Sequence, residues 1–207
     1  MANANHNIAF RPLRGGVGIL NPRVMHPGTL GAILSAGTER YLLSCHHVLV
    51  GESPGAVPDG EAVYQPNTAN ALVATVALAL SDRVLDCAVA RVVNGVDCLG
   101  EILGLPVLAG IADPVEGMRV IKSGAETGVT EGVVDLVNGD QVRIAVPSEF
   151  DAEYELSAEG DSGALWVCRD SMKAVALHKG GSASGVHFAF STRLNAILGK
   201  LGMQLLI

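Results

Sequence analysis

Short apolar runs recur along most of this chain, and residues that favour turns separate them. Residues 28–34 and 40–44, for example, flank the glycine-containing loop 36–39, which is typical of a β-hairpin. Residues 138–140, Asn-Gly-Asp, mark another turn between two apolar runs. Many short strands at this spacing predict an all-β fold, either a sandwich or a barrel.

The C-terminal segment has the period of a helix instead. Apolar residues recur there at helical spacing: Leu194, Ile197, Leu198, Leu201 and Leu205. We therefore expect one helix over about residues 193–203, packed on the β-structure. Two prolines and three glycines in residues 99–114 predict a link between two halves of the chain. Residues 1–14 are expected to form a polar, partly disordered extension.

Composition narrows the class of protein. The chain has 207 residues, of which 49% are hydrophobic and 17% charged, enough for one domain or for two half-domains that share a cleft. The net charge is -7 and the lysines and arginines form no run, so no nucleic-acid partner is expected. The longest near-apolar stretch, residues 71–80, is much shorter than the ~20 residues of a spanning helix, so no membrane partner is expected either.

The N-terminal residues and the cysteines indicate in which cellular compartment the protein is expected. Residues 1–7 contain neither the basic region nor the apolar region of a secretory signal. The four cysteines have no metal-binding spacing, and without a signal they are expected to be free thiols. We therefore expect a cytoplasmic protein.

Three short segments carry candidate chemistry. One apolar run ends in His46 and His47, a second begins at Asp86, and a third follows the glycine-flanked Ser162. Taken singly, each has an ordinary explanation: a surface histidine, a turn aspartate and a glycine-rich turn. Together they supply a nucleophile, a base that takes its proton, and a carboxylate that orients the base.

The order of these residues along the chain is informative. α/β-Hydrolases run Ser, acid, His and carry Gly-x-Ser-x-Gly, whereas Ala164 stands two residues after Ser162 here. Subtilisin begins with the aspartate. The order His, Asp, Ser is that of chymotrypsin.

The chain resembles the chymotrypsin/trypsin-like serine peptidases over residues 15–205, and most closely the short bacterial protease domains of the Deg/HtrA type. Ser-Cys-His-His-Val-Leu resembles the family motif Thr-Asn-x-His-Val-Val, which makes His47 the base. Asp-Cys-Ala-Val-Ala resembles Asp-Leu-Ala-Val-Leu, which makes Asp86 its partner. Gly-Asp-Ser-Gly matches the nucleophile motif, with Ser162 as nucleophile and the backbone N–H groups of Gly160 and Ser162 as the oxyanion hole.

The resemblance implies a fold of two antiparallel Greek-key β-barrels with a C-terminal helix. The N-terminal barrel is expected over about residues 15–100, the C-terminal barrel over about 115–192 and the closing helix over about 193–203. Asp161 is expected to hold the oxyanion loop through internal hydrogen bonds. Because side chains alternate along a strand, we expect only one of the neighbours His46 and His47 to face the cleft.

The resemblance also indicates a substrate-binding region. It comprises Leu156, Ser157, Leu177, His178 and Gly180. Leu156 stands where trypsin-type members carry aspartate, so the residue before the cleaved bond (P1) is expected to be apolar. His178 could instead bind a Glu or Gln side chain, or could only satisfy a hydrogen bond in the core. Lys179 is expected to point away from His178.

The sequence thus predicts a serine endopeptidase acting on intracellular protein or peptide substrates, with no metal and no cofactor. Two alternatives stay open. One is a catalytically silent peptide-binding module, and the other is a protein that processes itself and then stops.

Overall fold

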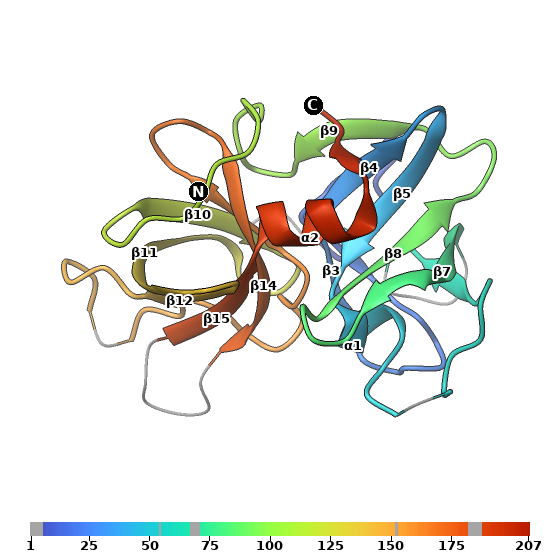
Figure 1. The fold of residues 1–207 in the computed structure, drawn as a ribbon, viewed down its shortest axis with the longest axis horizontal. Helices are drawn as coiled ribbons and strands as arrows, with labels where there is room; N and C mark the ends of the chain where they lie inside the picture. The colour runs from blue at the N-terminus through green and yellow to red at the C-terminus, as the bar shows by residue number, and fades with distance from the viewer. Residues whose placement is uncertain (1–5, 54, 67–70, 152, 182–187) are drawn as a thin grey trace.

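The chain forms two β-rich lobes that lie side by side, with helix α2 across the junction between them (Figure 1). The computed structural model describes residues 6–53, 55–66, 71–151, 153–181 and 188–207. Within these ranges no helix is long and apolar enough to cross a membrane. The all-β character predicted from the apolar runs is confirmed, because strands make up most of the regular structure.

The first lobe is built on a six-stranded antiparallel sheet. Its strands lie in the order β16 (Gln204–Leu205), β4 (Ala32–Ala36), β5 (Glu39–Ser44), β8 (Cys87–Val92), β7 (Leu72–Asp82) and β6 (Ala62–Tyr64). Two strand pairs complete the lobe: antiparallel β2 (Val17–Ile19) with β3 (Gly28–Leu30), and parallel β1 (Leu13–Gly15) with β9 (Cys98–Ile102). The predicted hairpin is confirmed for β4 and β5, whereas Gly28–Leu30 forms the separate strand β3.

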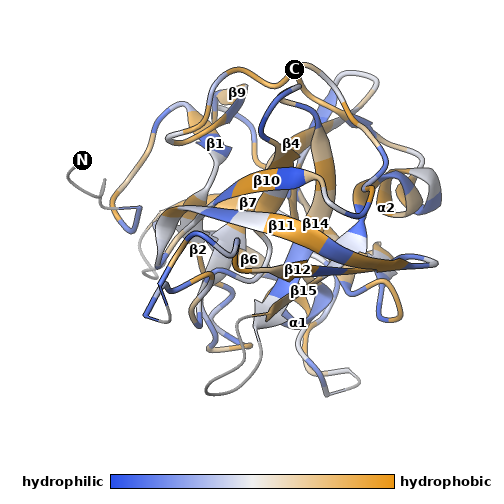
Figure 2. Cartoon of the chain, turned by 90° about the vertical axis from the view of Figure 1, so that its left-hand side faces the viewer, coloured by the Kyte–Doolittle hydropathy of each residue, from blue (hydrophilic) through white to orange (hydrophobic). Residues whose placement is uncertain are grey.

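The second lobe is a closed six-stranded barrel. Its order is β10 (Arg119–Gly124), β11 (Gly128–Asn138), β12 (Gln141–Ala145), β15 (Phe188–Arg193), β14 (Ala174–Gly181) and β13 (Leu165–Cys168). The interior holds small and branched apolar side chains around one fully buried Trp166. Figure 2 shows apolar residues concentrated along the strands, and several peripheral loops are hydrophilic.

The C-terminal helix α2 (Leu194–Leu201) buries Leu194, Ile197, Leu198 and Leu201. It ends at Gly202, whose φ of 64° is left-handed and favours glycine. Leu205, which continues the helical spacing beyond the predicted helix, lies in β16 and pairs with β4 of the first lobe. The apolar spacing therefore continues one turn beyond the helix, into a strand where Leu205 is partly buried.

Two further expectations change. Of the predicted link over residues 99–114, residues 99–102 belong to strand β9, and residues 103–114 lead from it toward β10 of the second lobe. Of the predicted polar extension, residues 1–5 lie outside the described residues, but His6 is 5% exposed and its Nδ1 lies 2.6 Å from the carbonyl oxygen of Gly16. Gln65 of the first lobe also bonds the backbone of Ile8 and Phe10. Residues 6–14 are therefore packed onto the fold.

Candidate active site

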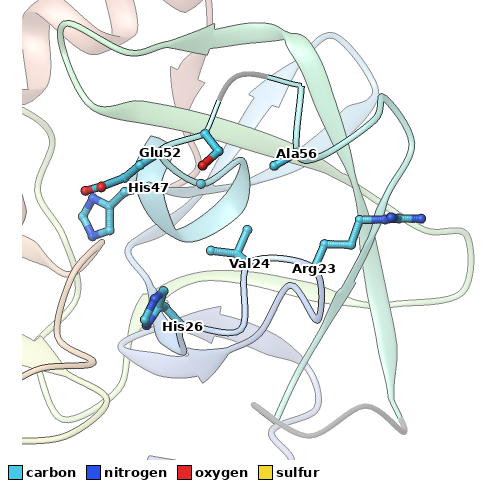
Figure 3. Close-up of a pocket in the computed structure, with 8 residues that line it drawn as sticks. Arg23, Val24, His26, His47, Glu52 and Ala56 are labelled. Atoms are coloured by element: carbon cyan, nitrogen blue, oxygen red, sulfur yellow. The ribbon is translucent and has the colours of Figure 1, made fainter.

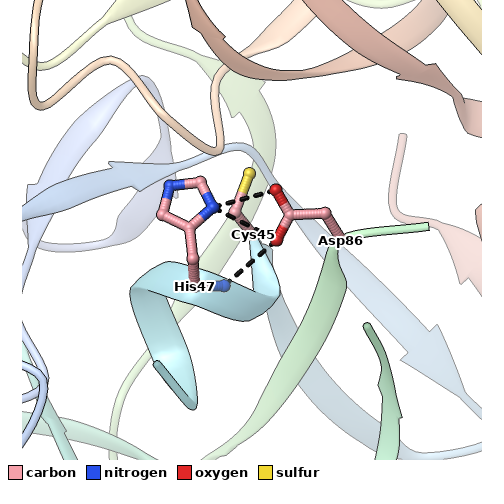
Figure 4. A group of neighbouring side chains, drawn as sticks. All are labelled: Cys45, His47 and Asp86. Carbon is pink, nitrogen blue, oxygen red and sulfur yellow. Dashed lines mark hydrogen bonds and ion pairs between the residues drawn. The ribbon is translucent and has the colours of Figure 1, made fainter. Parts of the chain in front are cut away.

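His47 and Asp86 form a hydrogen-bonded pair in the first lobe. His47 Nδ1 lies 2.8 Å from Asp86 Oδ2 and 3.1 Å from Oδ1, and the backbone N–H of His47 donates to Oδ1 at 3.1 Å (Figure 4). Asp86 ends the tight turn between β7 and β8 and has a φ of 51°. Thr192 of the second lobe donates to the carbonyl of Leu85 at 2.8 Å, which helps to position that turn. The ring of His47 is thus oriented by Asp86 through one of its nitrogens.

His46 and His47 lie in helix α1 (His46–Leu49), directly after β5. The expectation that the two histidines alternate along a strand is therefore wrong, because the chain leaves the sheet at Cys45. Only His47 bonds Asp86, although both histidines line the cavity over that pair. Burial lowers the pKa of His46, and Asp86 only partly opposes this shift.

Ser162 lies in the loop between β12 and β13, where the two lobes meet. Its carbonyl accepts the backbone N–H of Thr29 from the first lobe at 2.8 Å. The approach is close: a Cβ on Gly31 would overlap the carbonyl oxygen of Gly163. Glycine at position 31 therefore lets the first lobe come close enough to place Ser162 at the lobe junction.

The hydroxyl of Ser162 donates to the carbonyl of Lys179 at 2.8 Å. Among the described residues it has no hydrogen bond with His47, although His47 uses only Nδ1 for Asp86. The sequence predicts that Ser162 gives its proton to His47. In ligand-free structures such catalytic hydrogen bonds are often long or misdirected and tighten only when substrate binds.

The loop before Ser162 presents two backbone donors. Gly160 has a φ of 105°, a conformation that favours glycine. Its carbonyl accepts the hydroxyl of Thr29 at 2.8 Å, and that same hydroxyl accepts the N–H of Ala125 at 2.9 Å. Within the described part of the chain, the N–H groups of Gly160 and Ser162 have no acceptor. These are the two donors that the sequence motif assigned to an oxyanion hole.

Asp161, between these two donors, is fully buried and fully bonded. Its Oδ2 lies 2.7 Å from Nζ of Lys122 and accepts the hydroxyl of Thr127 at 2.6 Å, and the N–H of Ala158 lies 3.2 Å from it. Oδ1 accepts the N–H groups of Glu126 and Thr127 at 3.0 and 3.1 Å. Burial alone raises the pKa of Asp161, but the charge of Lys122 and these hydrogen bonds outweigh burial and lower it to about 2. The expected internal hydrogen bonds are present, and a buried lysine adds a charge to them.

The predicted substrate-binding residues occupy different environments. Leu156 is 5% exposed and packs in the barrel core, and Leu177 of β14 is fully buried in the apolar cluster that both lobes share. Ser157 is half-buried, and a Cβ on Gly181 would lie 2.8 Å from its hydroxyl. Gly180 has open space where its Cβ would stand. Leu177 therefore contributes no exposed side chain, whereas Ser157 and Gly180 remain accessible.

His178 is fully buried beside Trp166, with ring centroids 6.0 Å apart and the rings nearly perpendicular. Neither ring nitrogen has a hydrogen-bond partner among the described residues. Burial, followed by the charge of Lys122, lowers the pKa of His178 to about 3, so its ring is neutral near pH 7. Lys179 points away as predicted, and its Nζ donates to Gln141 at 2.8 Å.

Two cavities meet at His47. One of about 370 Å³ is lined by Arg23, Val24, His26, His47 and Glu52, among others (Figure 3). The other, of about 450 Å³, lies over the His47–Asp86 pair and is also lined by residues His46, Glu52, Arg83 and Lys179. Both sides of the imidazole can therefore be reached from solvent.

Two functional residues could not be singled out by their sequence motifs. Lys122 appeared only as a cation at the end of an apolar run, and Thr29 only as a polar residue in a predicted strand. A lysine beside an apolar run is a weak signal, because lysine is mostly exposed and is fully buried only when it is paired, as Lys122 is with Asp161. Thr29 had no such signal.

Comparisons with known proteins bear on this arrangement. No protein-family model and no curated protein matches the sequence. Among solved structures, Thermobifida fusca protease A aligns with a TM-score of 0.71 and 18% identity, over 93% of this chain and 97% of that one. A glutamic-acid-specific serine protease that uses a histidine triad in substrate binding aligns with a TM-score of 0.74 and 19% identity, over 93% of this chain and 100% of that one. An α-lytic protease homologue, N4, aligns with a TM-score of 0.71 and 23% identity, over 93% and 98%. The chain therefore has a chymotrypsin-like fold, which confirms the fold that its motifs implied.

Proposed function

We propose that this protein is a serine endopeptidase in which Ser162 is the nucleophile, His47 the general base and Asp86 the residue that orients His47. The observation that carries the proposal is the meeting of three groups at one lobe junction. These are the paired His47 and Asp86, the hydroxyl of Ser162, and the two unengaged N–H groups beside it. The similar solved structures are those of proteases, which supports the same reaction class.

The chemistry follows from the hydrogen bonds. Because Nδ1–H of His47 donates to Asp86, the lone pair at Nε2 is free to take a proton. The Ser162 hydroxyl leaves the Lys179 carbonyl, gives its proton to Nε2 and attacks the peptide carbonyl. The imidazolium then protonates the leaving amine, and a water activated by His47 hydrolyses the acyl-enzyme.

The negative oxygen of the tetrahedral intermediate would be bound by the N–H groups of Gly160 and Ser162. Such donors act strongly because they are held in place before the charge develops. Asp161 and Lys122 hold the loop from inside the barrel, and Thr29 holds the carbonyl of Gly160 from the other lobe. Lys122 supplies the buried amine that pairs with Asp161 in this arrangement.

An extended substrate would add as a strand beside the end of β14. There β14 pairs with β15 on one side, through Gly180 with Phe190 and Gly181 with Ala189. Its pairing with β13 on the other side stops at Leu177. The backbone of residues 179–181 is thus available on the side of Ser162 for pairing with a peptide.

We propose an apolar P1 residue, because Leu156 supplies no charge and the ring of His178 is buried and neutral. Glu or Gln is the second candidate, supported by the unpartnered ring nitrogens of His178 and by the specificity of the glutamic-acid-specific neighbour. A P1-varied peptide library separates them. Preference for Leu, Phe or Met supports the first, and a Glu preference that disappears in His178→Ala supports the second. Preference for Lys or Arg contradicts both.

The natural substrates are proposed to be intracellular proteins, which is supported by the four free thiols. The Deg/HtrA likeness rests on the motifs at His47 and Asp86 alone.

Labelling with a fluorophosphonate tests the nucleophile directly. We expect wild-type protein to be labelled and to cleave added peptides, and Ser162→Ala to fold but do neither, with kcat lower by about 10⁴–10⁶-fold. Ser148→Ala is the control, because it removes an exposed hydroxyl outside the candidate site and keeps Ser162. Absence of labelling in the wild type would favour the silent binding module, and labelling without turnover of added peptide would favour self-processing.

A further inference from the structure

Three side chains of different ligand chemistry converge beside the candidate active site. The thiol of Cys45, the imidazole of His47 and the carboxylate of Asp86 have ligand atoms that all lie within 4.8 Å of one another (Figure 4). Within the described ranges this is the one group of its kind. Catalysis as proposed above uses His47 and Asp86 but leaves Cys45 without a role.

The three donors match the preferences of Zn²⁺. Zinc takes sulfur, nitrogen and oxygen ligands at about 2.0–2.3 Å in a tetrahedron, so neighbouring ligand atoms stand roughly 3.3–3.8 Å apart. His47 Nδ1 and Asp86 Oδ2 are 2.8 Å apart and need to separate slightly, while the sulfur needs to move in by at most about an ångström. A thiolate also discriminates against Mg²⁺ and Ca²⁺, which prefer oxygen.

The group can be reached from one side and is buried on the other. The side chains of His47 and Asp86 are 29% and 20% exposed and border the cavity of about 450 Å³. Cys45 is fully buried, and its thiol donates to the carbonyl of His178 at 3.1 Å. That carbonyl also accepts the N–H of Gly163, so it keeps a partner if the thiol turns away. An ion entering from the cavity meets the pair first and the sulfur behind it.

We propose that Cys45, His47 and Asp86 form a reversible inhibitory site for Zn²⁺. The fourth position of the ion is left for water. The proton balance explains inhibition: the thiol of Cys45 loses its proton to the buffer, and the proton on Nδ1 of His47 moves to Nε2 as Nδ1 binds the metal. With Nε2 protonated, His47 has no lone pair for the proton of Ser162.

Binding of Zn²⁺ at this site does not depend on the proposed peptidase activity, whereas the inhibitory role rests on that proposed function. Binding and inhibition are therefore measured separately.

Cobalt is the probe for binding, because a Co²⁺–thiolate bond absorbs in the near ultraviolet and carboxylate or imidazole ligands alone do not give that band. Full-length reduced protein is titrated with Co²⁺, and Zn²⁺ is then added. We expect the band in wild-type protein and in Cys87→Ala, no band in Cys45→Ser, and loss of the band on adding Zn²⁺. Cys87 is the matched control because it is equally buried and follows Asp86 directly.

Peptidase inhibition is measured against each variant's own metal-free rate. We expect the Zn²⁺ concentration that halves activity to rise by at least roughly tenfold in Cys45→Ser and to stay within about twofold in Cys87→Ala, with Mg²⁺ and Ca²⁺ inactive in all. Cys45→Ala is the second variant if Cys45→Ser does not fold. Absence of the cobalt band in wild-type protein, or its persistence in both Cys45 variants, overturns the site even if no peptidase activity is found. If the cobalt band is present but Zn²⁺ inhibits wild type and Cys45→Ser equally, the site exists but its inhibitory role is overturned.

Discussion

Replacing Lys122 with methionine tests whether the buried ion pair holds the candidate active site in place. The side chains of Lys122 and Asp161 are both 0% exposed. Nζ of Lys122 lies 2.7 Å from Oδ2 of Asp161 and 2.9 Å from the hydroxyl of Thr127. Methionine fills a similar volume without the charge. Asp161 then remains buried as an uncompensated carboxylate with only hydrogen bonds from Thr127 and three backbone N–H groups.

The cost can be estimated from what is removed. Breaking a buried ion pair by deleting one partner costs about 3–5 kcal/mol, a large share of the about 5–15 kcal/mol that stabilises a typical domain. We expect Lys122→Met to lower the free energy of unfolding at pH 7 by about 3–5 kcal/mol. Peptidase activity is expected to fall as well, because Gly160 and Ser162 flank Asp161.

The loss of stability in Lys122→Met is expected to depend on pH, because Asp161 can be protonated. In the wild type the pKa of Asp161 falls to about 2 on folding, so its contribution is complete above about pH 4 and is lost as the pH falls toward 2. Without Lys122, burial raises that pKa, and the ionised carboxylate becomes a penalty that grows as the pH rises through 4. The gap in stability between wild type and variant is therefore expected to widen from pH 3 to pH 7.

Urea unfolding followed by circular dichroism and by the fluorescence of the single tryptophan measures this gap. Lys173→Met, at an exposed lysine, is the control and is expected to change stability by less than about 0.5 kcal/mol. Lys122→Met combined with Asp161→Asn is expected to recover much of the loss, because no buried charge remains. A loss below about 1 kcal/mol at pH 7, or an equal loss at pH 3 and pH 7, refutes the reasoning.

Three further outcomes follow from the geometry. His47→Ala is expected to lower kcat for peptide cleavage by about 10⁴-fold or more, and His46→Ala by less than about tenfold. A larger loss in His46→Ala than in His47→Ala would identify His46 as the base. Thr29→Val leaves the carbonyl of Gly160 and the N–H of Ala125 without their hydrogen-bond partners. Calorimetry is therefore expected to show a free energy of unfolding lower by about 1–3 kcal/mol, and an unchanged melting temperature would contradict this. All four cysteines are expected to titrate as thiols in unfolded, unreduced protein, and fewer than four thiols would indicate a disulfide. Cys87 is expected to react slowly in the folded protein, because burial raises its pKa to about 12.

Several properties of the molecule were readable from the sequence because they are local. Strand and turn patterns depend on which neighbouring residues are apolar, and they predicted the β4–β5 hairpin and the all-β character. The motifs around His47, Asp86 and Ser162 combine residue type with order along the chain, and both can be read without coordinates. The same local reasoning explains why Lys179 was expected to point away from His178.

The partners of buried polar groups were decided by the tertiary structure. Lys122 and Asp161 are 39 residues apart, and Thr29 and Gly160 are 131 apart, so no periodicity connects them. Leu205 satisfies the helical spacing but lies in a strand, because its backbone pairs with β4, which is distant in the sequence.

The state of the reactive groups depended on the fold in the same way. The sequence left open whether His178 meets a substrate or lies in the core, and in the fold its ring is fully buried. It suggested that Ser162 turns to His47, whereas the Lys179 carbonyl accepts its hydroxyl. Residue types and their order carry the chemistry that is available, but burial and hydrogen-bond direction arise from segments that only the folded chain brings together.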